Sequence, residues 1–180
     1  MSDIDTSTGG RPPSKAERRI ERLRQVGRWL RYAGEDMLVA KEHAGGRPDA
    51  IARQACFHAQ LAAEKAIKAG LVYLSREVPH HHDLDGLLQR LPRSWIVGQE
   101  VKASALSLAT LTAWAVRARY PDDLPDADEA DAREAVEIAT RVCTYILSDL
   151  ERLRYQPVWG PDRDPDPPVT VWLERILNRD

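Results

Sequence analysis

Apolar residues recur at every third or fourth position along most of this chain, the spacing that places them on one face of an α-helix. In the first such segment, about residues 14–43, the repeating positions are Ile20, Leu23, Val26, Leu30, Ala33, Met37, Ala40 and Ala44. In the second, about residues 50–75, alanine dominates, at Ala55, Ala59, Ala62, Ala66 and Ala69. The pattern predicts two long amphipathic helices, and Asp49 between them is predicted to cap the second.

Further helical segments follow in the second half of the chain. A short helix is predicted over residues 84–91, and a longer amphipathic helix over residues 98–117. The last long helix is predicted over residues 127–154, where Asp126 and Glu129 have the spacing of a capping box.

No segment alternates apolar and polar residues for long enough to predict a strand. We therefore expect an all-α protein, an antiparallel up-and-down bundle of about four to five helices. The expected organisation is a flexible arm at residues 1–13, the bundle at 14–154, and an extended tail at 155–180. A short terminal helix in that tail is predicted to dock through Trp172 and Leu173.

The composition is that of an ordinary soluble globular protein, with 43% hydrophobic and 30% charged residues. No apolar run approaches the roughly 20 residues that a membrane-spanning helix needs, and the N-terminal residues lack the apolar core of a secretory signal. Cys56 and Cys143 lie on apolar sides of helical patterns, which indicates buried free thiols rather than a disulfide. These features predict a cytoplasmic protein without a membrane segment.

Charge is unevenly distributed, although the net charge is only −2. Residues 11–31 hold eight basic residues against Glu17 and Glu21, and residues 122–137 hold eight acidic residues against Arg133. The separation permits an anion-binding face at one end and an acidic loop at another. Each run is also compatible with a solvated helix surface.

A stripe of mostly polar residues runs along one side of the alanine-rich second helix. At about 100° per residue, this stripe contains Arg53, Phe57, Gln60, Glu64 and Lys68. His58 and Lys65 fall on a neighbouring stripe beside the alanines. Two interpretations stay open: a solvated helix edge with an internal salt bridge, or the rim of a groove that binds a ligand.

Three ordered motifs resemble those of the HEPN family (higher eukaryotes and prokaryotes nucleotide-binding). The segments ACFHAQ at 55–60 and AAEKAIKA at 62–69 resemble the second helix of that family, with Leu61 where a second glutamine is commoner. His82-Asp83-Leu84 resembles the "HDL" start of its third helix. Arg119-Tyr120-Pro121-Asp122 resembles the "RYP" loop before its final core helix, and the resemblance covers roughly residues 29 to 150.

The resemblance implies a bundle of about five helices, often a homodimer, that binds nucleotide or RNA. Many members of the family act as the helical partner of a small nucleotidyltransferase in toxin–antitoxin-like modules, and this is the function we expect. Other branches are metal-independent endoribonucleases with an Arg-x4–6-His motif, in which histidine serves proton transfer and arginine stabilises phosphate charge. The alternatives are therefore such a ribonuclease, or a non-catalytic protein-interaction module.

Arg53 and His58 match the ribonuclease motif and are the candidate catalytic residues. The match decides little, because a chain with this many arginines and histidines gives roughly two matches by chance. The two side chains are also about 140° apart around the helix. No histidine follows Arg119, although the ribonuclease branches place their motif by the final core helix.

The histidine run before the third helix does not have the ligand spacing of a metal site, and we expect neither a metal nor another cofactor. Asp83 is instead predicted to cap the short helix, and His82 to hydrogen-bond to a neighbouring element. The loop after the fourth helix either closes the bundle end or contacts phosphate and stacks a base. The predicted nucleotide- or RNA-binding residues are Lys65, Lys68, His82, Arg117, Arg119 and Tyr120.

Overall fold

The computed structural model describes residues 11–45, 51–104, 107–117, 126–157 and 168–179, and for residues 115–117 the backbone alone. Over these residues the chain forms helices and no strand, which confirms the all-α prediction. The helices are α1 (Lys15–Ala44), α2 (Ala52–Tyr73), α3 (Leu84–Leu88), α4 (Ile96–Ala103), α5 (Leu108–Arg117), α6 (Glu129–Arg152) and α7 (Val169–Leu177). The described part of the chain thus has seven helices, somewhat more than the four to five expected.

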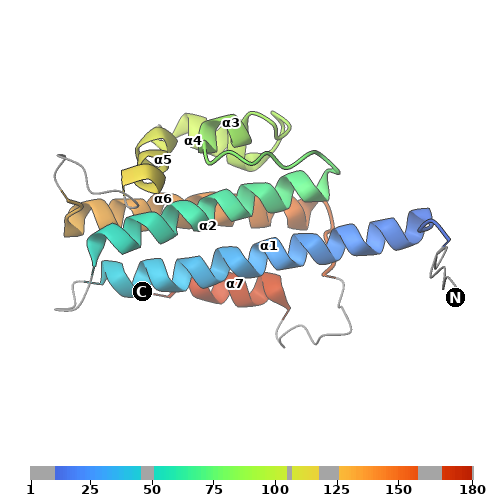
Figure 1. The fold of residues 1–180 in the computed structure, drawn as a ribbon, viewed down its shortest axis with the longest axis horizontal. Helices are drawn as coiled ribbons and strands as arrows, with labels where there is room; N and C mark the ends of the chain where they lie inside the picture. The colour runs from blue at the N-terminus through green and yellow to red at the C-terminus, as the bar shows by residue number, and fades with distance from the viewer. Residues whose placement is uncertain (1–10, 46–50, 105–106, 118–125, 158–167, 180) are drawn as a thin grey trace, which may run out of the picture.

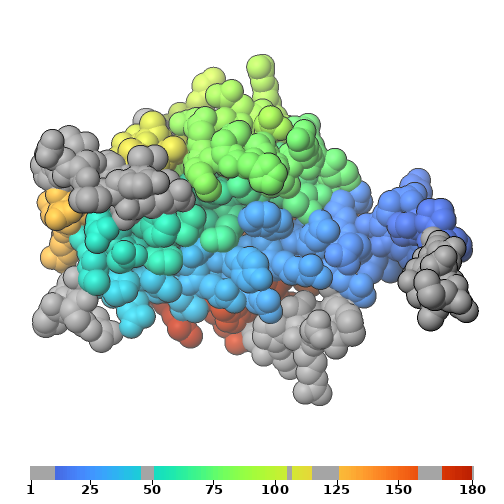
Figure 2. All heavy atoms as spheres, in the orientation of Figure 1, coloured from blue at the N-terminus to red at the C-terminus, as the bar shows by residue number. Residues whose placement is uncertain are grey.

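Helix α2 occupies the centre of the bundle. Helices α1 and α6 each pack along it, and α7 packs on α1 and α6. Helices α3, α4 and α5 lie together on the side of α2 that faces away from α7, and they return the chain to the start of α6 (Figure 1). The start of α1 projects beyond the rest of the bundle at one end (Figures 1 and 2).

Alanine allows α2 to be covered on both sides. Its fully buried small residues are Ala55, Ala59, Ala62, Ala63, Ala66 and Ala69. Because a methyl group takes little room, the neighbouring helices can approach closely and supply the larger side chains themselves. Leu30 and Met37 of α1 and Ile146 and Leu150 of α6 are all completely buried in the same core.

The single helix predicted over residues 98–117 is wrong, because the structure divides it into α4 and α5. Helix α4 packs on α6, whereas α5 packs on α2. Asp149 of α6 holds the start of α4: its fully buried carboxylate accepts hydrogen bonds from Ile96 N at 2.8 Å and Val97 N at 3.1 Å. At the start of α5, the Ser107 hydroxyl accepts a hydrogen bond from Thr110 N at 3.3 Å. The two helices therefore have different packing partners, which the apolar periodicity of the segment does not reveal.

The ends of the long helices follow standard capping chemistry, with two changes of detail. Ser14 and Glu17 form a capping box at α1. The capping box of α6 is formed by Asp128 and Asp131, so the prediction of Asp126 and Glu129 is wrong by two residues. Helix α2 begins after Ile51 without a side-chain cap, and Asp49 lies outside the described residues.

The first turns of α6 are strongly acidic and lie at the opposite end of the molecule from the start of α1 (Figure 1). The acidic residues there are Asp128, Glu129, Asp131, Glu134 and Glu137. Negative side chains near a helix N-terminus are favourable, because the partial positive charge of the helix dipole lies there. The two charged runs of the sequence are therefore separated along the long axis of the bundle.

Both cysteines are buried and free, as the sequence predicts. Burial, together with the nearby charge of Asp36, raises the pKa of Cys143 to about 12, so this thiol is unreactive at neutral pH. None of the helices in the described ranges combines the length and apolar character that a membrane crossing requires.

Helix α7 docks against a glycine of α1 through the two residues that the sequence indicates. A Cβ atom at Gly34 would lie 2.5 Å from Cζ3 of Trp172 and 3.2 Å from Cδ1 of Leu173. The absent side chain thus lets the indole ring lie directly on the α1 backbone. Lys41 of α1 also donates a hydrogen bond of 2.9 Å to the Leu177 carbonyl at the end of α7.

We expect Gly34→Ala to lower the free energy of unfolding by about 2 kcal/mol, because the new methyl group must displace Trp172 in a packed interface. Gly98→Ala is the matched control, since a Cβ there meets no atom within 4 Å. In a helix this control should add up to about 1 kcal/mol of stability. Urea unfolding of the two variants measures both effects, and equal stability would show that α7 does not rest on Gly34.

Candidate functional site

Three members of the polar stripe on α2 are buried, so for them the solvated-edge interpretation is wrong. Gln60, Glu64 and Lys68 expose 0%, 4% and 6% of their surface. They lie on α2 among its fully buried alanines and face both α1 and the segment before α3. Burying a charged pair in such a core is costly unless every charge has partners.

Glu64 is the centre of a hydrogen-bonded cluster, which we call the Glu64 network. Its carboxylate accepts hydrogen bonds from Lys68 Nζ at 2.7 Å and Gln60 Nε2 at 2.9 Å. Nδ1 of His82 lies 3.0 Å from the same carboxylate. Lys68 Nζ is also 5.8 Å from the centre of the Trp29 ring, a cation–π contact that links the network to α1.

Glu64 is held ionised by its neighbours. Burial alone raises the pKa of Glu64, but the hydrogen bonds from Lys68, Gln60 and His82 outweigh it and lower this pKa below its usual value. An ionised carboxylate only accepts hydrogen bonds, so Nδ1 of His82 must carry the hydrogen in their contact. The Nε2 atom of a neutral His82 ring is then an acceptor.

His82 is the part of the Glu64 network that reaches the surface. Its side chain is 46% exposed, whereas that of Glu64 is 6% exposed. The backbone of the histidine is fixed as well, because its carbonyl accepts a hydrogen bond of 3.3 Å from Gln60 Nε2. The prediction that His82 bonds to a neighbouring element is therefore confirmed, and its partner is α2.

The rest of the HDL motif anchors the start of α3. The Asp83 carboxylate caps the helix by accepting a hydrogen bond from Asp85 N at 3.1 Å, as predicted. Leu84 is completely buried, and its backbone N–H donates to Thr112 Oγ1 of α5 at 3.2 Å. The motif thus joins a surface histidine to a capping carboxylate and a core leucine in three consecutive residues.

A second carboxylate pairs with the neighbouring stripe of α2. Asp36 of α1 forms an ion pair with Lys65 and accepts a hydrogen bond of 2.9 Å from Nδ1 of His58. The side chains of Asp36 and His58 are 13% and 25% exposed, so this pair is only partly shielded from water. His58 is therefore oriented by α1.

The predicted ligand-binding residues that the structure describes differ in their partners and exposure. Lys65 and Lys68 are neutralised by Asp36 and Glu64, so a phosphate would have to compete with these carboxylates. His82 is half exposed and has its Nδ1 on Glu64. Arg117 is the last residue of α5, while Arg119 and Tyr120 lie outside the described residues.

Sequence reasoning missed two residues that organise this region. Asp36 joins His58 to Lys65, and Trp29 lies beside Lys68, yet both belong to α1. A helical wheel of α2 cannot show which residues of another helix face it. The available signal for Asp36 was its position directly before Met37 of the apolar face, although Glu35 and Glu42 in the same half of α1 make that signal weak.

Within the described ranges, no group of three or more His, Cys, Asp or Glu side chains has the arrangement of a metal site.

A family model for the HEPN domain matches residues 26–150 of this chain. The chain belongs to the HEPN family. The match begins within α1 and ends within α6, and it includes the α2, HDL and RYP motifs. A search of curated proteins and a search of solved structures each found no match. Membership of the HEPN family supports a function related to nucleotides or RNA in general.

We expect Glu64→Gln to lower the free energy of unfolding at pH 7 by about 3 kcal/mol, because it leaves the Lys68 ammonium buried without a counter-ion. The pKa of Glu64 is lowered in the folded state, so its stabilisation is present above the pKa of an unfolded glutamate. It is lost as the pH falls through the lower, folded-state value. The difference between parent and variant should therefore shrink in acid.

Urea unfolding at pH 7 and at successively lower pH measures this difference. Glu35→Gln is the control, because the ion pair of Glu35 with Arg31 is long and exposed on the surface of α1. The control should unfold like the parent at every pH. A Glu64→Gln variant as stable as the control at pH 7 would contradict the central role of this carboxylate.

Proposed function

We propose that this HEPN protein binds nucleotide or RNA on the surface around His82, and that it is the helical partner of a small nucleotidyltransferase in a toxin–antitoxin-like module. The observation that carries the ligand site is the His82–Glu64 contact of 3.0 Å. It presents a half-exposed imidazole in one fixed orientation at the edge of a rigid, buried network. The family match supports the ligand class.

The ring of His82 suits a nucleotide or an RNA strand. With Nδ1 donating to Glu64, the neutral ring can accept a hydrogen bond at Nε2 from a ribose hydroxyl or a base N–H group. A protonated ring can instead donate to a phosphate oxygen. The proposed ligand contacts are His82 together with Arg117, Arg119 and Tyr120.

In this proposal Lys65 and Lys68 have a different role from the direct ligand binding that the sequence suggests. Their ammonium groups hold Asp36 and Glu64, and these carboxylates in turn orient His58 and His82. We propose that the lysines act on the ligand through the histidines. Direct binding of phosphate by either lysine stays a prediction.

A metal-independent ribonuclease is the second candidate, and a specific observation favours it. His58 and His82 each have Nδ1 on a carboxylate, an arrangement that prepares Nε2 to accept a proton. In that reaction the histidine would take the proton of the 2′-hydroxyl as its oxygen attacks the adjacent phosphorus. The bond to the 5′-oxygen then breaks, and that oxygen takes up a proton.

The partners are proposed on the family resemblance. We propose a homodimer, and a complex with a small nucleotidyltransferase encoded by a neighbouring gene. Light scattering of the purified chain and co-purification of the two gene products test these assemblies. A complex with the nucleotidyltransferase, without any binding of nucleotide or RNA, would favour a protein-interaction module instead.

We expect His82→Ala to weaken binding of ATP or of a single-stranded RNA about tenfold, which corresponds to about 1.4 kcal/mol. His80→Ala is the matched control, because His80 is an exposed histidine of the same loop with no hydrogen bond to the Glu64 network. Fluorescence anisotropy measures both variants. Equal affinities would remove His82 from the ligand site.

The same samples decide between binding and cleavage. RNA that stays intact in the presence and absence of a metal chelator supports a binding protein. RNA that is cut in the presence of the chelator by the parent and by His80→Ala, but not by His82→Ala, supports the ribonuclease. If RNA cleavage is lost in His58→Ala and kept in His82→Ala, the reaction is assigned to His58 and its partner Asp36.

A further inference from the structure

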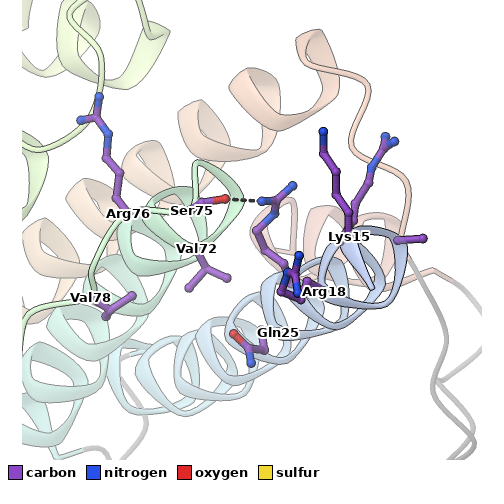
Figure 3. A pocket seen from close by; sticks show the side chains of 10 residues that line it. Lys15, Arg18, Gln25, Val72, Ser75, Arg76 and Val78 are labelled. Atoms are coloured by element: carbon purple, nitrogen blue, oxygen red, sulfur yellow. Dashed lines mark hydrogen bonds between the residues drawn. The ribbon is translucent and has the colours of Figure 1, made fainter. Parts of the chain in front are cut away.

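A cavity of about 850 Å³ lies between the first turns of α1 and the end of α2 (Figure 3). Among the side chains that line it, none is acidic and five are cationic: Lys15, Arg18, Arg19, Arg22 and Arg76. We call this the basic cavity. It shares no residue with the Glu64 network, and the four cations from α1 precede the region that the HEPN model matches.

The register of α1 directs four of these cations to one face. Lys15, Arg18, Arg19 and Arg22 are spaced at i, i+3, i+4 and i+7, which places them side by side along the helix. Further along α1 the corresponding face is covered by the bundle. Here α1 extends past the end of α2, so the same face is left open (Figures 1 and 3).

The cations that line the basic cavity differ from the other arginines of α1 in the ion pairs that the described residues supply. Outside the cavity, Arg24 and Arg28 are within 3.8 Å of Glu21, and Arg31 is 3.7 Å from Glu35. Within the cavity, no ion pair to a described residue is found for Lys15, Arg19 or Arg76. Neighbouring like charges repel each other, so binding of an anion at this face would relieve that repulsion.

Two further arginines of the cavity donate hydrogen bonds to neutral oxygens and keep their full charge. Arg18 donates to the Pro13 carbonyl, and Arg22 donates to the Ser75 hydroxyl. The Nε atom of Arg22 is buried and has no hydrogen-bond partner. These hydrogen bonds hold the two guanidinium groups in place, and because the acceptors are neutral they do not offset the positive charge.

The turn at the end of α2 brings the fifth cation to the cavity. Ser75 has a φ of 57°, and the chain closes with hydrogen bonds from Ser75 N to Val72 O at 3.0 Å and from Arg76 N to Leu71 O at 2.9 Å. This is a Schellman turn, in which glycine is the usual residue at the left-handed position. A serine there costs backbone strain, but its hydroxyl holds Arg22 (Figure 3).

We propose that the basic cavity binds a run of consecutive phosphate groups. Guanidinium groups recognise phosphate through two parallel N–H donors, and here those of α1 and of Arg76 in the turn after α2 line one cavity. The volume is within the range of sites that hold small ligands. The phosphates can come from the backbone of an RNA strand or from a free chain such as that of a nucleoside triphosphate.

The test uses the full chain with three probes: inorganic triphosphate, a fluorescent single-stranded RNA of about 12 nucleotides, and polyglutamate of similar charge. Arg19→Gln with Arg76→Gln removes two exposed cations, for which the described residues supply no ion pair, from opposite sides of the cavity. Arg28→Gln with Arg133→Gln is the control, since it removes the same charge from side chains that are 61% and 59% exposed and already paired.

We expect the cavity variant to bind phosphate probes at least tenfold more weakly than the parent, and the control variant to change less than threefold. For RNA, the slope of log K against log salt concentration should fall by about 1.4, because about 0.7 is lost for each phosphate contact on a single strand. Circular dichroism should show the same helix content in all three proteins. Equal loss in the cavity and control variants would overturn the proposal.

The probes distinguish the source of the phosphates. Displacement of RNA by triphosphate supports a site for a short phosphate chain, whereas binding of RNA alone supports a track for its backbone. Displacement by polyglutamate as effective as by triphosphate would overturn the preference for phosphate. The two proposals are tested by different variants, because His82→Ala tests the His82 site and Arg19→Gln with Arg76→Gln tests the basic cavity, so failure of one and failure of the other give different results.

Discussion

The ionised carboxylate of Glu64 is the group around which this bundle is organised. It lies on the central helix, where six fully buried alanines leave room for the neighbouring helices. A single carboxylate there holds Lys68 towards Trp29 of α1 and His82 at the approach to α3. Because an isolated charge in this core would be unstable, each of these contacts depends on the others.

This arrangement connects packing to recognition. Alanine brings α1, α2 and α6 close together, and the few polar groups between them must then meet in defined geometry. Two of those groups are histidines, and each has one ring nitrogen on a carboxylate. The interior of the bundle thereby determines how an imidazole is presented at its surface, which is a general way to build a site on rigid elements.

Much of the fold follows from the sequence, since α1, α2, α6 and α7 keep the apolar periodicity that predicts them. The division between α4 and α5 does not, because the two helices pack on different partners, α4 on α6 and α5 on α2. The start of α4 at Ile96 likewise depends on the buried Asp149 of α6, about fifty residues further along the chain. Around the candidate site, the polar stripe on α2 and the hydrogen bond of His82 to a neighbouring element could be predicted from spacing and motifs. The burial of Gln60, Glu64 and Lys68 could not, because a wheel shows which residues share a face and not what covers it.

The positions of the two charged runs have a physical consequence for the molecule as a whole. The start of α1 carries the cations of the basic cavity, and the first turns of α6 carry the carboxylates at the opposite end (Figure 1). With a net charge of only −2, the protein is a large electric dipole rather than a strongly charged body. Near a polyanion, the field exerts a torque on this dipole and turns the positive pole towards the source before contact is made. Salt screens that torque within about 10 Å, so the alignment acts only in the final approach.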